Sequence, residues 1–277
     1  MKNILSIDGG GIRGLIPLEI LKVFPQTPDL LAGTSTGGMI AVMLSLGISP
    51  EEISRIYIAE AKRIFRKPWW RTGWFFKTEY DGKGLRDVVE GVLGGKTMRD
   101  LKLPTIIPAF RVSGPKKNTL KVFKSWTDGE TSLVDVVLAT SAAPKYFPKY
   151  KDYVDGGLAA NNPAGCALAD ASRLWPAEKF KIISLGTGIK VENFEVSGGA
   201  LEIAPKIIDM VMDASASAVD YQCFCHPNAR YHRIQPKLRG KDWPMDSYSP
   251  KYLKKLQDLG KSVTKLEKVI NICQKIS

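Results

Sequence analysis

The chain has 277 residues, of which 44% are hydrophobic and 25% charged, so its composition is globular and excludes a mainly disordered chain. The longest apolar run, residues 39–48, is shorter than the roughly 20 residues that a membrane-spanning helix needs. Only residues 1–7 precede the first acidic residue, and four cysteines in a chain of this length do not resemble a disulfide framework. We therefore expect a cytoplasmic protein with one domain over residues 1–277.

The net charge of +12 is unevenly distributed. Residues 61–125 carry 16 basic and 5 acidic side chains, and residues 221–277 carry 12 and 4, whereas the remaining segments are acidic. Basic segments of this kind attract phosphate on a bilayer, a nucleotide or a nucleic acid. A solubilising surface is the alternative interpretation.

The N-terminal part of the chain alternates short apolar strands with helices. We expect, in order, a strand at residues 3–8, a glycine-rich loop at 9–14, a helix at 15–24, a strand at 29–32, a glycine-flanked turn at 33–37, an apolar and therefore buried helix at 38–46, and a helix that runs to about residue 65. Ser49 followed by Pro50 is the N-terminal signature of that last helix.

The rest of the chain continues the alternation after a basic and aromatic loop at about 66–80. We expect strands at 105–112, 119–126, 153–155 and 181–185, and helices at 132–139, 200–224 and about 250–276. Strands that alternate with helices predict an α/β protein with a largely parallel central sheet.

The loop Gly9-x-Gly11-x-x-Gly14 lies between a strand and a helix, which suggests a dinucleotide site. Such a site needs an acidic residue at the end of the second strand, but Asp29 stands at the beginning of that strand. A dinucleotide-binding enzyme therefore remains the less favoured interpretation. Successive glycines at the start of a helix still present backbone N–H groups that bind an anion.

The segment Gly33-x-Ser35-x-Gly37 has the pattern of a nucleophile elbow, because a strand precedes it and a buried helix follows. A glycine on each side of Ser35 permits a sharp turn that lifts the hydroxyl clear of the sheet. An ordinary glycine-flanked helix start is the alternative.

A serine nucleophile needs a base, and the chain has only two histidines, His226 and His232, neither in a recognisable motif. Asp155 ends an apolar strand and is followed by Gly156 and Gly157. A carboxylate at such a position has its pKa raised by desolvation, which suits a general base. A turn-capping aspartate is the alternative. The cysteines near His226 lack a second cluster, so we expect no metal site.

Taken together, these segments resemble the patatin-like phospholipases. The resemblance rests on residues 7–14 (IDGGGIRG), 33–38 (GTSTGG) and 155–157 (DGG), with support from 139–144 (ATSAAP), 161–163 (NNP) and 184–188 (SLGTG). It implies a three-layer α/β/α fold, no cofactor, and hydrolysis of lipid acyl esters by a Ser35–Asp155 dyad without histidine. The motif glycines are Gly14, Gly33, Gly37, Gly156 and Gly157.

The resemblance further implies an oxyanion hole built from Gly9, Gly10, Gly11 and Arg13, with Arg13 near the substrate phosphate. We expect the loop at about 66–80 to be a lid that contacts the inner face of the membrane. A surface loop whose aromatic side chains pack on the core is the alternative. An inactive lipid-binding or storage protein is the main alternative function.

The compact length and the segment 245–250 (MDSYSP), which leads into the last helix, resemble bacterial members of the family. Some of those members are antiphage effectors activated by a cyclic oligonucleotide. We therefore expect a phosphate-rich second messenger as activator, with the basic middle segment or Arg230, Arg233, Lys237, Arg239 and Lys241 as candidate contacts. A homo-oligomer is a further expectation, whereas a nucleic acid polymer is not an expected partner.

Overall fold

The computed structural model describes residues 1–23, 28–67, 78–191, 200–240 and 242–265. Within these ranges, no helix has both the length and the apolar character needed to cross a bilayer. The predicted lid lies mostly outside the described residues, as do Leu266 and Ile270 of the predicted last helix.

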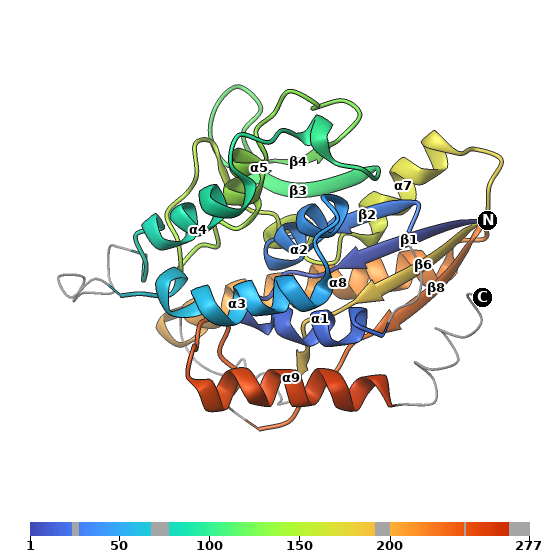
Figure 1. Cartoon of the computed structure of the whole chain (residues 1–277). Helices are drawn as coiled ribbons and strands as arrows, with labels where there is room; N and C mark the ends of the chain where they lie inside the picture. The colour runs from blue at the N-terminus through green and yellow to red at the C-terminus, as the bar shows by residue number, and fades with distance from the viewer. Residues whose placement is uncertain (24–27, 68–77, 192–199, 241, 266–277) are drawn as a thin grey trace.

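The centre of the molecule is a mixed sheet in which strands follow the order β4-β3-β2-β1-β6-β8, and β5 pairs with the end of β3 (Figure 1). Its strands are β1 (Lys2–Ile7), β2 (Leu30–Gly33), β3 (Thr105–Arg111), β4 (Thr119–Lys124), β5 (Tyr153–Asp155), β6 (Phe180–Leu185) and β8 (Ala229–Ile234). Pairing is parallel from β3 through β8, whereas β4 and β5 are antiparallel to β3. The predicted largely parallel sheet is confirmed.

Side chains of the central strands alternate between two apolar cores, as the period of two in a strand requires. In β1, Leu5 and Ile7 pack into one core and Ile4 into the other. In β6, Ile183 belongs to the first core and Ile182 to the second. A sheet buried on both faces needs helices on both, which explains the layered architecture.

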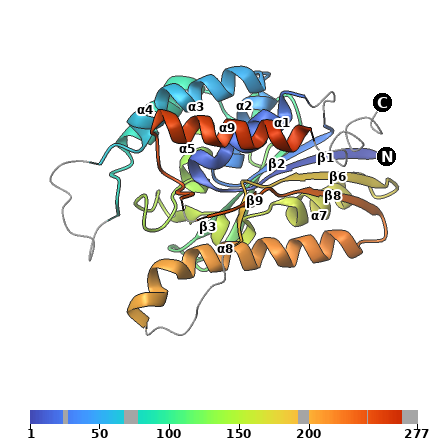
Figure 2. The same ribbon diagram turned by 90° about the horizontal axis from the view of Figure 1, so that it is seen from below.

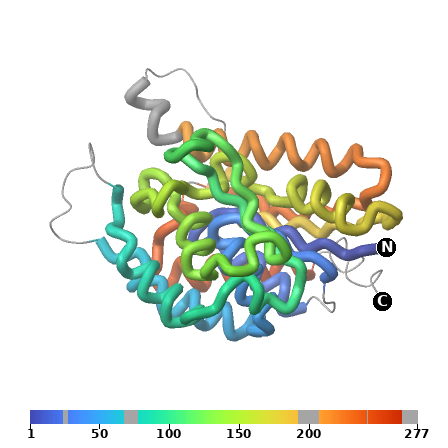
Figure 3. Tube along the Cα trace, turned by 90° about the horizontal axis from the view of Figure 1, so that it is seen from above, coloured from blue at the N-terminus to red at the C-terminus, as the bar shows by residue number. Residues whose placement is uncertain are grey.

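Helices cover both faces of the sheet, and the predicted three-layer α/β/α fold is confirmed (Figure 2). The first face carries α1 (Leu15–Leu21), α2 (Thr36–Ser45), α3 (Pro50–Ile64), α4 (Lys83–Leu93), α5 (Leu133–Thr140) and α9 (Pro250–Thr264). The opposite face carries α6 (Gly157–Ala160), α7 (Ala164–Leu174) and α8 (Ala200–Cys225). Viewed from the other side, α8 and α3 again lie on opposite sides of the sheet (Figure 3).

The remaining elements are short. They are the 3₁₀ helices η1 (Gly11–Gly14) and η2 (Met98–Asp100), and a separate parallel pair formed by β7 (Ile189–Lys190) and β9 (Lys237–Leu238). Ser49 caps α3 as predicted, accepting a hydrogen bond from the Glu52 amide at 3.2 Å.

Two details differ from the sequence-based expectations, and the extent of the last helix is only partly described. Helices α4 and α7 were not predicted, because α4 contains Gly84 and Gly91 and α7 buries mainly alanines rather than large apolar side chains. Helix α9 is described over Pro250–Thr264, and residues 266–276 of the predicted helix lie outside the described residues. Tyr80, assigned to the lid, is buried against Phe65 and Phe147.

Candidate active site

Ser35 occupies a sharp turn between the end of β2 and the start of α2. Its backbone angles, φ 55° and ψ −122°, are unfavourable for a residue with a side chain. Strain of this kind costs on the order of 1–3 kcal/mol and persists only where the surroundings enforce it. The turn has the geometry of a nucleophile elbow, with the serine at the end of the sheet and above the amino end of a helix.

The two flanking glycines of the elbow have no room for a side chain. A Cβ on Gly33 would lie 2.0 Å from the Gly37 carbonyl oxygen, and one on Gly37 would lie 2.1 Å from the Ile7 carbonyl oxygen. Both contacts involve backbone atoms, which have little freedom to move away. Glycine is therefore required at both positions for the turn to form.

Neighbouring threonines hold the elbow in place. The Ser35 amide donates to Thr140 Oγ1 at 2.9 Å, and the Thr140 hydroxyl donates in turn to the Pro108 carbonyl at 2.5 Å. The Thr34 hydroxyl donates to the Ala160 carbonyl at 2.6 Å. These bonds connect the turn to β3, α5 and α6, so the strained backbone is fixed by three separate elements.

Asp155 ends β5, where its pairing opposite Ala109 in β3 brings it to the same edge of the sheet. Its side chain is only 2% exposed. Burial raises the pKa of its carboxyl to about 6, while the Ser35 hydroxyl and the Gly157 amide partly oppose that rise. Oδ1 accepts a hydrogen bond from the Gly157 amide at 2.7 Å, whereas Oδ2 is buried without a hydrogen-bond partner among the described residues.

Gly156 and Gly157 allow the chain to turn tightly after Asp155. A Cβ on Gly156 would lie 2.2 Å from the Pro108 carbonyl oxygen. One on Gly157 would lie 2.7 Å from Met212 Cε and 3.1 Å from the Asp155 carboxylate. The second glycine also brings its amide to the carboxylate, so the motif both shapes the turn and orients the side chain.

The glycine loop after β1 contains the predicted hydrogen-bond donors of the oxyanion hole, and not all of them are available. The Gly9 amide donates to the Asn161 carbonyl at 3.2 Å and is therefore already engaged. Within the described part of the chain, the amides of Gly10 and Gly11 donate no hydrogen bond, and both residues line the cavity that contains Ser35. The Thr187 hydroxyl fixes the loop by donating to the Gly9 carbonyl at 2.6 Å. The predicted donors are thus reduced to Gly10 and Gly11.

Arg13 does not line the cavity that contains Ser35. Its buried side chain lies in a second, more polar cavity with Asp209 and Asp213, and its Nε donates a long hydrogen bond of 3.5 Å to the Gly10 carbonyl. Burial lowers the pKa of the guanidinium, against the influence of these two carboxylates. In the tight helix η1, Ile12 faces the cavity of Ser35 and the next side chain points elsewhere. The structure thus places Arg13 beside the glycine loop but in a different cavity from Ser35, and its contact with an oxyanion or a substrate phosphate stays a prediction.

Ser35 and Asp155 open into one largely apolar cavity that is partly open to solvent. Its apolar lining consists of Ile12, Met39, Ile64, Phe65, Leu85, Ala143, Pro144, Phe147, Leu158, Ile208, Met212 and Met245. A cavity with a few polar groups at one end and an apolar wall is suited to an acyl chain attached to a polar ester.

Neither histidine lies in this cavity. His226 follows α8 and accepts a hydrogen bond from the Asn228 amide at 3.3 Å, whereas His232 lies within β8, opposite Ile183. The described residues include no cluster of side chains able to hold a metal ion. Of the two histidines and Asp155, only Asp155 lines the same cavity as Ser35 among the described residues.

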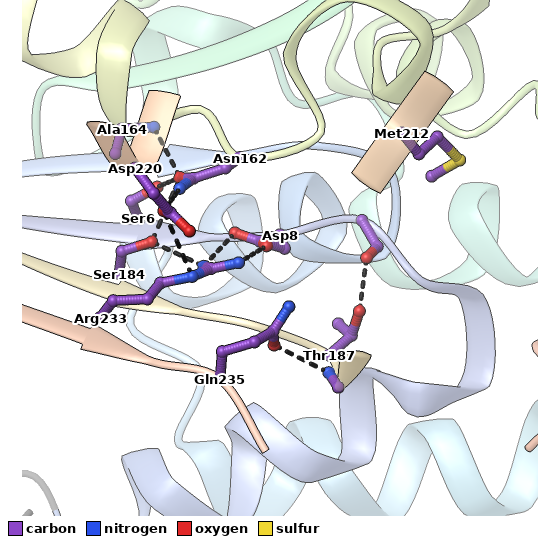
Figure 4. Close-up of polar contacts among 12 residues, drawn as sticks. Ser6, Asp8, Asn162, Ala164, Ser184, Thr187, Met212, Asp220, Arg233 and Gln235 are labelled. Atoms are coloured by element: carbon purple, nitrogen blue, oxygen red, sulfur yellow. Dashed lines mark hydrogen bonds and ion pairs between the residues drawn. The ribbon is translucent and has the colours of Figure 1, made fainter. Parts of the chain in front are cut away.

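A second buried aspartate, Asp8, follows the last residue of β1 and immediately precedes the glycine loop (Figure 4). Arg233 of β8 binds it with two hydrogen bonds, Nη1 to Oδ1 at 2.9 Å and Nη2 to Oδ2 at 2.5 Å. Burial raises the pKa of Asp8 to about 6, and Arg233 opposes that rise. Despite its own burial, Arg233 has its pKa raised by Asp8. The pair is a buried salt bridge.

Polar side chains extend this salt bridge across the sheet (Figure 4). Arg233 also donates to the Ser184 hydroxyl at 2.8 Å. Asn162 Oδ1 accepts from the Ser6 and Ser184 hydroxyls, each at 3.2 Å, and its amide donates to Asp220 at 2.8 Å. The network joins β1, β6, β8 and α8, and through Asp8 it is adjacent to the start of the glycine loop.

The sequence interpretation missed this role of Arg233, which was predicted among the contacts of a second messenger. The ion pair with Asp8 removes Arg233 from that set, and Lys241 lies outside the described residues. Met245 is a further addition to the site: its carbonyl accepts from the Ile12 amide at 2.8 Å, and it lines the cavity. No motif marks Arg233 in the sequence, and Met245 belongs to the segment 245–250, which gave no indication of a place in the cavity.

The amino-acid sequence of this chain is similar to those of known proteins. The family model described as patatin-like phospholipase matches residues 5–168, which include the glycine loop, the elbow and Asp155. "Patatin-like protein 2" of Arabidopsis thaliana is 30% identical over 84% of this chain and 75% of its own length.

Two bacterial proteins named "cGAMP-activated phospholipase" are also similar. The one from Pseudomonas aeruginosa is 29% identical over 85% of this chain and 78% of its own length. The one from Escherichia coli is 34% identical over 62% of this chain and 56% of its own length. Because the family model covers more than half of the chain, the protein belongs to the patatin-like phospholipase family and is a lipid esterase.

Proposed function

We propose that this lipid esterase hydrolyses acyl ester bonds of membrane phospholipids through Ser35 and Asp155. One observation carries the proposal: the strained Ser35, the Asp155 carboxylate and the glycine loop share an apolar cavity. Among the described residues, one Asp155 oxygen and the Gly10 and Gly11 amides have no hydrogen-bond partner. Nucleophile, base and oxyanion donors for acyl transfer are then provided without histidine, metal or cofactor residues.

The reaction proceeds through an acyl-serine. As Ser35 Oγ attacks the ester carbonyl carbon, Asp155 Oδ2 accepts the hydroxyl proton, and the carbonyl oxygen becomes an oxyanion that accepts hydrogen bonds from the Gly10 and Gly11 amides. Asp155 then gives the proton to the departing alcohol oxygen as the carbon–oxygen bond breaks. Water enters next, loses a proton to Asp155 and releases the fatty acid, after which Ser35 regains its proton.

The pKa of Asp155 suits this exchange. A carboxyl with a pKa of about 6 is mainly ionised at neutral pH, yet it is more basic than an exposed aspartate and therefore accepts a proton more readily. The apolar cavity holds the acyl chain, so the enzyme works at a bilayer rather than on free polar esters. We place it in the cytoplasm, associated with the inner face of the membrane.

Activation by a cyclic oligonucleotide, in antiphage defence, is the second part of the proposal. Its support is the names of the two bacterial relatives, both described as cGAMP-activated phospholipases, and the excess of basic residues in this chain. The messenger phosphates bind exposed basic side chains and favour the active conformation or oligomer, by as much as the affinities for the two states differ.

Hydrolysis of fluorogenic phospholipids with and without a panel of cyclic di- and trinucleotides tests both parts. We expect fatty acid release that rises at least about tenfold with one member of the panel and is absent in Ser35→Ala. Full activity without any nucleotide would remove the switch but retain the enzyme. Binding of lipid without hydrolysis under every condition would instead indicate a lipid-binding protein.

A further inference from the structure

A segment that precedes α9, residues 243–248, packs against the glycine loop, and we call it the strap. The Met245 carbonyl accepts a hydrogen bond from the Ile12 amide at 2.8 Å, and a Cβ on Gly11 would lie only 2.2 Å from that carbonyl oxygen. Met245 also lines the cavity that contains Ser35. The strap therefore fixes the position of Gly11, whose amide is one of the two proposed oxyanion donors.

Two aromatic side chains hold the first half of the strap. Trp243 Nε1 donates to the Arg239 carbonyl at 2.9 Å, and the Tyr252 hydroxyl of α9 donates to the Pro244 carbonyl at 2.6 Å. The two rings meet edge to face with their centroids 6.4 Å apart, and both side chains are buried. These contacts anchor the strap to the start of α9.

Asp246 connects the strap to a distant part of the chain. The Tyr80 hydroxyl donates to Asp246 Oδ2 at 2.6 Å. Because the peptide bond between Met245 and Asp246 is planar, this hydrogen bond acts on the same rigid unit as the carbonyl that holds the glycine loop. Burial and the neighbouring Asp246 raise the pKa of the Tyr80 hydroxyl, so it stays protonated and able to donate at neutral pH.

Tyr80 is itself fixed to the wall of the active-site cavity. Its amide donates to the Tyr146 carbonyl at 2.8 Å, and its ring packs against Phe65 and Phe147 with centroid distances of 5.6 and 5.5 Å. Those three residues line the cavity. In Figures 1 and 2 the end of α3 and the start of α9, which these contacts connect, lie at the same end of the molecule. The bond from Tyr80 thus joins the wall that receives the acyl chain to the strap.

We propose that Tyr80 and Asp246 are positioning residues for the oxyanion hole. Their hydrogen bond holds the Met245 carbonyl against the glycine loop, which aligns the Gly10 and Gly11 amides with the oxyanion. This inference rests on the proposed function, since it concerns the donors of that reaction. Neither side chain lines the cavity, so both act through the backbone of the strap and the loop. Displaced donors lose contact with the charge that develops in the transition state, so the effect falls on kcat.

Initial rates on fluorogenic phospholipid, taken under the nucleotide condition that gives the wild type its highest rate, test the proposal. We expect Tyr80→Phe and Asp246→Ala each to lower kcat about tenfold with KM within about twofold, because each removes the bond outside the cavity. The double variant Tyr80→Phe/Asp246→Ala should be no slower than either single variant, as for the two ends of one interaction. Asp246→Asn keeps an oxygen that accepts from Tyr80 and should retain most of the rate that Asp246→Ala loses.

Tyr150→Phe is the matched control. The Tyr150 hydroxyl donates to Asp135 Oδ1 at 2.5 Å, so this substitution removes the same kind of bond, but neither residue lines the active-site cavity. Because distant sites act independently, Tyr150→Phe should keep kcat within about twofold of the wild type.

Inhibition by an alkyl trifluoromethyl ketone separates positioning from a general loss of structure. The Ser35 hydroxyl adds to the ketone carbonyl and passes its proton to Asp155, which leaves an oxyanion in the place where the ester oxyanion forms. Tyr80→Phe should therefore bind this ketone about tenfold more weakly, in step with kcat/KM.

Three results would overturn the positioning role and leave the proposed function intact. They are a kcat of Tyr80→Phe equal to that of the wild type, a loss of the same size in Tyr150→Phe, and equal rates of Asp246→Ala and Asp246→Asn. The last comparison decides the question even where Tyr80→Phe does not fold. A wild type that hydrolyses no ester under any nucleotide condition would overturn the proposed function, and this inference with it.

Discussion

The two buried aspartates at the ends of β1 and β5 share a raised pKa but differ in what faces them. Burial raises the pKa of both Asp8 and Asp155 to about 6. Both oxygens of Asp8 accept hydrogen bonds from Arg233, whereas Oδ2 of Asp155 has no hydrogen-bond partner among the described residues, and Asp155 lines one cavity with Ser35. A perturbed pKa thus marks both carboxylates, but only the geometry of their partners distinguishes a base from a structural anchor.

The first prediction tests whether Asp155 and Asp8 have different roles, by removing each carboxylate in turn. We expect Asp155→Asn and Ser35→Ala each to lower phospholipid hydrolysis by roughly 10⁴-fold, because either change removes the acyl transfer pathway. The double variant Asp8→Asn/Arg233→Met removes a charge pair without leaving either partner alone, and it should keep more than about a tenth of the activity. Initial rates on fluorogenic phospholipid measure all three. Equal losses would mean that Asp8 also takes part in the chemistry.

The second prediction concerns stability at the anchor. Arg233→Met leaves the Asp8 charge buried without a partner, which should lower the free energy of unfolding by about 3–5 kcal/mol at pH 8. Arg230→Met, an exposed position on the same strand, serves as the matched control and should change it by less than about 0.5 kcal/mol. Urea unfolding provides the measurement, and similar values for the two variants would contradict the anchoring role.

The third prediction concerns the glycine loop at residues 9–14, which directly follows Asp8. A Cβ on Gly10 would lie 2.1 Å from Thr187 Oγ1, so Gly10→Ala displaces the loop and should lower kcat about 100-fold with little change in KM. Gly94→Ala is the control, since Gly94 also has a positive φ of 56° but meets nothing within 4 Å of its Cβ position. That variant should lose some stability and keep its kcat. A change confined to KM in Gly10→Ala would restrict the loop to substrate binding.

The smallest expected effect is a gain in stability. Because the pKa of Asp155 is raised in the folded state, its contribution to stability is present below about pH 4 and is lost as the pH rises through about 6. Asp155→Asn should therefore raise the free energy of unfolding by about 1–3 kcal/mol at pH 8 and by much less at pH 4. Thermal unfolding at the two pH values checks this, and an equal or lower stability at both would contradict the burial argument.

The local parts of the site could be predicted from the sequence because their geometry is set by neighbouring residues. Gly33, Ser35 and Gly37 lie within one turn, and a strand before them with a buried helix after them is sufficient to indicate an elbow. Asp155 is recognisable for the same reason, since it ends a strand and precedes two glycines. The alternation of strands and helices likewise indicated the layered fold.

The rest depends on contacts between distant parts of the chain. Asp8 and Arg233 are 225 residues apart, and they meet only because β8 pairs with β6 in a particular register. The engagement of the Gly9 amide depends on Asn161, which arrives with α6. The family match ends at residue 168, so it does not extend to Arg233 either.

The central claim is that Asp155 activates Ser35, and the pH dependence of Ser35 labelling by a fluorophosphonate tests it most directly. In the wild type, the account predicts labelling at Ser35, located by peptide mapping, with a rate that rises with pH through about 6 as Asp155 ionises. Folded Asp155→Asn should label about 1000-fold more slowly and without that rise. Labelling of another serine, or an unchanged rate and pH profile in Asp155→Asn, would contradict it.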